Sequence, residues 1–130
     1  MTYIIAGATG TTGRAIATEL ARTDKVHLIG RDESALIELA DNLNSSYSLI
    51  NIENPIPVKE FQQTVEIDEI KGLVNCIGSI YLRPLHGSTI EDFNAVVNTN
   101  LFSSFYLLSA FARRMKNGSA IFFSSVAATK

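Results

Sequence analysis

Three glycines near the start of the chain, Gly7, Gly10 and Gly13, have the spacing that lets a backbone approach a phosphate. They follow a short apolar run, residues 3–6, and precede a stretch whose apolar residues recur at helical spacing. Without side chains, the backbone can turn tightly, approach a pyrophosphate and let the helix lie against the strand. The amide groups at the start of the helix then face the phosphates. This order predicts a dinucleotide-binding unit, although such glycines also occur in ordinary turns.

Charged residues at the end of the next apolar run bear on which dinucleotide binds. Gly30, Arg31 and Asp32 follow residues 26–29. An acidic residue at this place holds the hydroxyl groups of the adenosine ribose, whereas an arginine favours a 2′-phosphate. Arg31, together with Arg14 near the glycine turn, therefore favours NADP, and NAD stays possible. Asp32 can instead cap the following helix, and the alternative for Arg31 is an exposed loop charge.

Short apolar runs alternate with longer amphipathic stretches along the whole chain. The runs at about residues 3–8, 26–29, 47–50, 73–77 and 120–123 are expected strands. Helices are expected at about 11–22, 33–43, from Pro57 onward, and 89–116. Strands that are apolar on both faces indicate a parallel sheet covered by helices on both sides. The fold class is therefore α/β, a three-layer doubly wound parallel sheet that is Rossmann-like, with five strands in the order 3-2-1-4-5.

The last expected helix, 89–116, is the longest. Ser88 and Glu91 have the spacing of a capping box at its start. Basic residues in its last turn favour the helix dipole. An apolar stripe runs along it, and the residues that form the stripe are Phe93, Val97, Leu101, Phe105, Leu108, Ala112 and Met115.

Composition excludes several classes of protein. The 130 residues are 46% hydrophobic and 18% charged, which is typical of one folded domain over residues 1–130. A net charge of −2 supplies no basic stripe, so neither nucleic-acid nor membrane binding is expected. We also expect no apolar stretch long enough to span a bilayer. Cys76 is the single cysteine, which favours a cytoplasmic protein, and His27 and His86 lack spaced partners for a metal site.

Four segments, in order, resemble the short-chain dehydrogenase/reductase family. The first is the glycine turn, and the second is Asn-Cys-Ile-Gly at 75–78, where the family has an Asn-Asn-Ala-Gly-like motif. The third is Val-Asn-Thr-Asn at 97–100, and the fourth is the segment 118–125, which ends in two serines. The resemblance covers essentially the whole chain.

The resemblance implies roles for particular residues. Asn100 and Ser125 match the family's catalytic asparagine and serine, and a hydroxyl at a strand end can hydrogen-bond a substrate carbonyl. The alternatives are an exposed asparagine and an ordinary polar strand end. The candidate cofactor-binding residues are Gly7, Thr9, Gly10, Thr12, Gly13, Arg31, Asn51, Asn75 and Gly78.

The chain departs from the family pattern in two respects. Its glycines have the spacing Gly-x-x-Gly-x-x-Gly, which looks like the extended or atypical branches of the family. The family's catalytic Tyr-x-x-x-Lys pair would lie beyond Lys130, and none of the four tyrosines in the chain is followed by lysine four positions later. That tyrosine is the general acid, so we expect the C-terminal part of the family fold to be absent and the chain alone to bind better than it catalyses.

These observations support one main function and leave two alternatives open. The main hypothesis is the NADP(H)-binding part of an oxidoreductase that transfers hydride between the nicotinamide and a small carbonyl or alcohol substrate. The alternatives are a non-catalytic dinucleotide-binding sensor or binding module, and a half-domain completed by another chain. Residues 120–123 would form an apolar sheet edge, so self-association as a homo-oligomer, or a fragment of a longer protein, is also expected.

Overall fold

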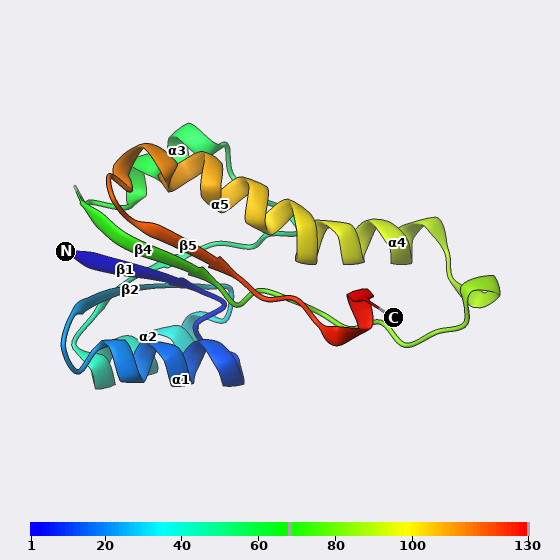
Figure 1. Cartoon of the computed structure of the whole chain (residues 1–130), viewed down its shortest axis with the longest axis horizontal. Helices are drawn as coiled ribbons and strands as arrows, with labels where there is room; N and C mark the ends of the chain where they lie inside the picture. The colour runs from blue at the N-terminus through cyan, green and yellow to red at the C-terminus, as the bar shows by residue number, and fades with distance from the viewer. Residues whose placement is uncertain (68, 130) are drawn as a thin grey trace.

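Five parallel strands form one sheet in the computed structural model, which describes residues 1–67 and 69–129 (Figure 1). Their order is β3-β2-β1-β4-β5, and every neighbouring pair is parallel. The order reverses between β1 and β4, as in a doubly wound fold. The expected fold class and strand order are therefore confirmed. The strands are β1 (Thr2–Ala6), β2 (Lys25–Gly30), β3 (Ser46–Leu49), β4 (Ile70–Asn75) and β5 (Ser119–Phe122).

Helices cover both faces of this sheet, α1 and α2 on one side and α3 and α5 on the other (Figure 1). Asp32 caps α2 as expected, because its side chain accepts a hydrogen bond from the Ala35 amide at 3.1 Å. The α-helices are α1 (Thr11–Leu20), α2 (Glu33–Leu43), α3 (Val58–Thr64), α4 (Ile90–Val97) and α5 (Ser103–Phe111). Short 3-10 segments occur at η1 (Leu85–Gly87), η3 (Ala112–Arg114) and η4 (Val126–Thr129), and a π-turn at η2 (Asn98–Phe102).

Two apolar cores lie on opposite faces of the sheet, because successive strand residues point to opposite sides. Ile4 and Ile29 pack with Phe61 of α3 and Phe111 of α5. On the other face, apolar residues of β1 and β2 pack with Leu36 of α2 and its neighbours. The central strands are therefore buried on both sides, which explains their continuous apolar sequence.

The expected helix 89–116 consists of α4, η2, α5 and η3 in succession. Its capping box lies one residue later than predicted. The Thr89 hydroxyl accepts from the Asp92 amide at 3.1 Å, and the Asp92 carboxylate accepts from the Thr89 amide at 2.9 Å. The prediction of Ser88 and Glu91 was wrong because α4 begins one residue later, with Thr89 as its N-cap, so that Asp92 occupies the third helical position.

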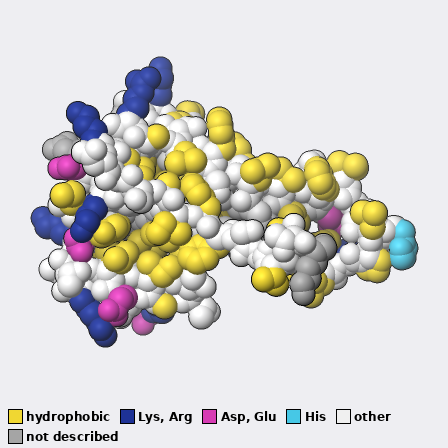
Figure 2. Space-filling model, viewed as in Figure 1, with side chains coloured by type: hydrophobic (Ala, Val, Ile, Leu, Met, Phe, Trp, Pro, Cys, Tyr) yellow, Lys and Arg dark blue, Asp and Glu magenta, His cyan; other side chains and the backbone are white. Residues whose placement is uncertain are grey.

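Much of the apolar stripe on this helix is uncovered. Phe93, Leu101 and Phe105 are each about two-thirds exposed, and Ile121 and Phe123 at the β5 edge are also exposed. Figure 2 shows hydrophobic side chains gathered on this face of the molecule. The expected apolar sheet edge is present, so this face is suited to pairing with further protein.

The segment Ile90–Arg114 is long and apolar enough, by length and composition alone, to cross a membrane. The expectation that no such stretch exists was therefore wrong. The helix that covers a sheet in a globular protein can meet the same criterion, and α5 buries Tyr106, Leu107 and Phe111 against the rest of the chain. The segment is thus weak evidence for a membrane span.

A buried histidine joins β2 to β3. The two ring nitrogens of His27 lie 2.7 Å from the Ser46 hydroxyl and 2.9 Å from the Ser48 hydroxyl. Burial lowers the pKa of His27 to about 4 from 6.5. Because the folded chain disfavours the charged ring, this histidine contributes stability that is fully present above pH 6.5 and is lost as the pH falls towards 4.

We therefore predict that the free energy of unfolding falls by about 3 kcal/mol between pH 6.5 and pH 4 through His27 alone. Urea denaturation of the unchanged chain and of His27→Gln across this range measures the difference. His86→Gln is the matched control, because His86 lies in an exposed 3-10 turn and is expected to keep the pH dependence. Equal pH dependence in the unchanged chain and His27→Gln would contradict the assignment.

Arg114 closes the C-terminal end of α3 rather than acting only on the dipole of its own helix. Its guanidinium donates to the carbonyl oxygens of Gln62 and Val65, each at 2.7 Å, and of Ile67 at 3.3 Å. These carbonyls lie in the last turn of α3 and just beyond it, where a helix runs out of amide donors, and the Val65 carbonyl also accepts from the Ile67 amide. The side chain therefore connects two sequence-distant helices.

Arg114→Lys is expected to lower the free energy of unfolding by about 1–2 kcal/mol, because one ammonium group cannot replace a planar fork of donors. Thermal denaturation followed by circular dichroism provides the measurement. The exposed neighbour serves as the control, and Arg113→Lys should leave stability unchanged. The same loss in both variants would argue against the role of the three carbonyls.

Candidate functional site

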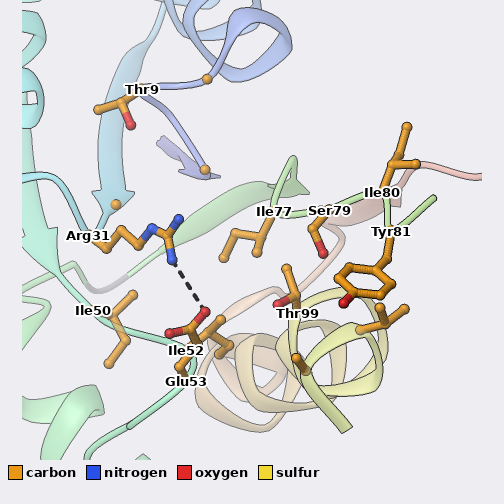
Figure 3. A pocket seen from close by; sticks show the side chains of 16 residues that line it. Thr9, Arg31, Ile50, Ile52, Glu53, Ile77, Ser79, Ile80, Tyr81 and Thr99 are labelled. Carbon is orange, nitrogen blue, oxygen red and sulfur yellow. Dashed lines mark hydrogen bonds and ion pairs between the residues drawn. The ribbon is translucent and has the colours of Figure 1, made fainter. Parts of the chain in front are cut away.

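A pocket of about 290 Å³ lies past the carboxyl ends of β1, β2, β3 and β4 (Figure 3). Residues after each of these strands line it, and Ala95, Val96 and Thr99 of the long helix form the opposite wall. It lies where the strand order reverses, which is where open α/β sheets bind ligands. Five of the predicted cofactor residues line this pocket: Gly7, Thr9, Gly10, Arg31 and Gly78.

The three glycines of the first turn have different reasons to lack a side chain. Gly7 has a φ of +71°, and a Cβ there would lie 2.8 Å from the backbone of Cys76 and Ile77. A Cβ on Gly13 would lie 2.1 Å from the Gly7 carbonyl oxygen. A Cβ on Gly10 would meet only that oxygen, at an ordinary 3.5 Å. The fold itself thus requires Gly7 and Gly13, whereas the empty space at Gly10 belongs to the pocket.

The start of α1 is open towards this space. Gly10 is its N-cap and supplies no capping side chain, and the first turn contains no acidic residue. Uncapped amides at a helix start attract anions. Thr12 and Gly13 belong to this first turn but do not line the pocket.

Arg31 meets an acidic partner that the sequence reasoning missed. Its guanidinium lies 3.5 Å from the Glu53 carboxylate, and both side chains are more than half exposed (Figure 3). The hydrogen bond from the Ile50 amide to the Gly30 carbonyl extends the pairing of β2 with β3 and brings the two loops together. The expected strand order could have indicated this ion pair, because the loops that follow adjacent parallel strands lie side by side.

Asn51 does not line the pocket, although Ile50 and Ile52 on either side of it do. Its side-chain oxygen accepts from the Glu53 amide at 3.0 Å, and its carbonyl accepts from the Asn54 amide. Asn51 therefore builds the turn that presents Glu53. Its predicted contact with a cofactor stays a prediction.

Two asparagines fix the loop after β4 to the long helix. The buried Asn75 donates to the hydroxyls of Ser103 and Ser104 and accepts from the Ile77 amide. Asn100 exchanges two hydrogen bonds of 3.1 Å with the backbone of Ser79. Roles for Asn75 towards the cofactor and for Asn100 in catalysis stay predictions, and the contacts seen here hold the pocket wall in place.

Asn100 also donates to the Val96 carbonyl within the helix, beside the π-turn at Asn98–Phe102. Its side chain is exposed, as the alternative to a catalytic role stated, and is nevertheless hydrogen-bonded to protein groups. A Cβ on Gly78 would approach the Asn100 side-chain oxygen to 3.2 Å. A small residue at position 78 therefore allows this contact.

Ser125 lies beyond β5, exposed, and outside the residues that line the pocket. Its hydroxyl accepts from the Ala127 amide at 3.2 Å, at the start of η4. Asn100 is not among the lining residues either, so the structure does not bring the two predicted catalytic residues together at the pocket. The catalytic role of Ser125 stays a prediction.

Tyr81 is the tyrosine that lines the pocket in the described part of the chain. Its hydroxyl donates to the Asp92 carboxylate at 2.7 Å, and this hydrogen bond raises the pKa of Tyr81. The Arg83 guanidinium lies 5.1 Å from the centre of its ring. The tyrosine is therefore held as a wall of the pocket and is a weaker acid than a free phenol.

The charge of the pocket comes from two side chains. Among the described residues that line it, Arg31 and Glu53 are the charged ones, and they face each other. Over residues 1–67 and 69–129, no group of three or more His, Cys, Asp or Glu side chains could hold a metal ion. An anionic ligand would therefore depend on backbone amides of the glycine turn and on Arg31.

A parallel sheet with a glycine turn and an open helix start at its switch point defines a dinucleotide-binding α/β domain. The family model described as short chain dehydrogenase matches residues 1–130. The chain therefore belongs to the short-chain dehydrogenase family of oxidoreductases.

Individual proteins show the same similarity. A tropinone reductase homologue of Arabidopsis thaliana is 30% identical over 138 residues, which cover 97% of this chain and 53% of that protein. Serine dehydrogenase of Escherichia coli is 27% identical with a TM-score of 0.90, covering 100% of this chain and 64% of the other. An alcohol dehydrogenase of Thermococcus sibiricus, in complex with 5-hydroxy-NADP, is 27% identical with a TM-score of 0.82, covering 92% and 55%. The chain spans about half the length of the curated relatives it matches.

The different surroundings of the glycines give a stability test. Gly13→Ala should lower the free energy of unfolding by about 3 kcal/mol or more, because the added carbon meets backbone that cannot move away. Gly10→Ala should stay within about 1 kcal/mol of the unchanged chain. Urea denaturation of the two variants compares them directly, and similar losses in both would contradict the roles assigned to these glycines.

Proposed function

We propose that this chain is the NADP(H)-binding part of an oxidoreductase that transfers hydride between the nicotinamide and a small carbonyl or alcohol compound. The observation that carries the proposal is the empty space at Gly10, which lines the pocket at the switch point beside an uncapped helix start. Nothing in the fold of the chain itself requires that space. A pyrophosphate bound by backbone amides would use it.

Each part of the pocket fits a part of such a coenzyme. The glycine turn, with Thr9, would bind the pyrophosphate, and Ile50 and Ile52 offer apolar surface near Arg31 for the adenine. The Arg31 guanidinium would bind a 2′-phosphate, which favours NADP over NAD. When bound, the coenzyme supplies the hydride, and the protein's contribution is to position it.

The catalytic roles of Asn100 and Ser125 belong to this proposal. The Ser125 hydroxyl would hydrogen-bond the substrate carbonyl, and Asn100 would hold the loop after β4 against the helix. Ser125 would have to approach the pocket from its present place beyond β5. Because Ser125 does not line the pocket, the structure also favours the second candidate function, a dinucleotide-binding module without catalysis.

Two further features of the chain bear on its cellular location and its partners. We infer a cytoplasmic location from the single cysteine, Cys76, and assembly with further copies through the exposed apolar edge at β5. The proposed partners are a small-molecule substrate and other copies of the chain, without nucleic acid or membrane.

Coenzyme binding tests the proposal directly. We predict that NADPH binds the chain and that Gly10→Ala weakens this binding about tenfold, because the added methyl group occupies the space of the pyrophosphate. The enhanced emission of the bound nicotinamide gives the dissociation constant. Gly87→Ala is the matched control, since its added carbon meets nothing within 4 Å and Gly87 lies outside the pocket lining.

Two outcomes would overturn the proposal. One is a lack of binding of NADPH and NADH by a folded chain. The other is an equal loss of affinity in Gly10→Ala and Gly87→Ala, since this would show that coenzyme binding does not depend on the glycine turn.

A further inference from the structure

The ion pair between Arg31 and Glu53 has no evident structural task. Both side chains are exposed, 69% for Arg31 and 58% for Glu53, and such pairs contribute little to stability. Both nevertheless line the pocket, and within the described residues no other charged side chain does. The position of this ion pair is therefore best explained by a role in ligand binding.

The position of Glu53 is built by its own loop. The Asn51 side chain accepts from the Glu53 amide, and the Asn51 carbonyl accepts from the Asn54 amide, which forms a tight turn after β3. The backbone pairing between Ile50 and Gly30 fixes this turn beside the loop that carries Arg31. The carboxylate thus faces the guanidinium because two hydrogen bonds shape the turn after β3 and one backbone hydrogen bond joins this turn to the loop of Arg31.

We propose that Glu53 limits how strongly this pocket discriminates between the two nicotinamide coenzymes. It holds the Arg31 guanidinium and places its own carboxylate beside the position that a 2′-phosphate must take to reach that guanidinium. This inference rests on the proposed function, because it concerns the same pocket.

The two coenzymes respond differently to this carboxylate. A 2′-phosphate must displace Glu53 from Arg31 and then lie near a charge of its own sign. A free ribose 2′-hydroxyl carries no charge, and a carboxylate is a good acceptor for it. Glu53 therefore weakens NADP binding, leaves NAD binding nearly unchanged, and makes the pocket less selective than Arg31 alone would make it.

Glu53→Gln tests this inference because it removes the charge while keeping the size and a hydrogen-bond acceptor. Isothermal titration calorimetry at fixed ionic strength would measure the dissociation constants of NADP+ and NAD+. We expect NADP+ to bind about fivefold more tightly to the variant, and NAD+ to change by less than about twofold. In an Arg31→Gln background, the same substitution should give a smaller gain for NADP+, because no guanidinium is left to release.

Glu19→Gln is the matched control, since it breaks another exposed Arg–Glu pair, 3.0 Å from Arg22, that lies outside the pocket. It should change neither dissociation constant. An unchanged ratio of the two constants in Glu53→Gln, or the same gain with and without Arg31, would overturn this inference while coenzyme binding still supports the proposed function. A folded, unchanged chain that binds neither coenzyme would overturn the proposed function and this inference with it.

Discussion

Helix α1 packs so closely on the turn after β1 that a single carbon atom on Gly13 would lie 2.1 Å from the Gly7 carbonyl oxygen. Gly7 is in turn pressed against the backbone between Cys76 and Ile77, with a φ of +71°. These two contacts fix the helix, the turn and the end of β4 relative to one another. The open amides in the first turn of α1 have a defined direction because the backbone on both sides of Gly10 cannot move.

The opposite wall of the pocket is held by side chains rather than by backbone contact. Asn75 and Asn100 each bridge the loop after β4 and the long helix, Asn75 through Ser103 and Ser104, and Asn100 through Ser79. A polar amide in the middle of a helix competes with the backbone hydrogen bonds around it, and the π-turn at Asn98–Phe102 occurs at this place. The two asparagines thus serve the shape of the pocket whether or not they also touch a ligand.

Hydrophobic periodicity was sufficient to predict the sheet order and the layers, and the spacing of the glycines predicted the first turn, because these depend on local pattern and on general rules of chain connection. The predicted strand ends were off by one to three residues. Pairings between distant residues were missed. Nothing in the local sequence connects Arg31 with Glu53, or Arg114 with the carbonyls at the end of α3. The location of Ser125 outside the pocket lining likewise depends on the path of the chain after β5, for which eight residues carry no periodic signal.

The long helix extends past the carboxyl ends of the strands, and α4 contains no buried residue (Figure 1). One side of the pocket is thus tied to a rigid, doubly covered sheet, while Ala95 and Val96 on the other side belong to a segment with little tertiary support. Segments of this kind open locally at a lower free energy than the sheet does. Displacement of α4 would therefore open this side of the pocket at a lower cost in free energy than any motion of the strands.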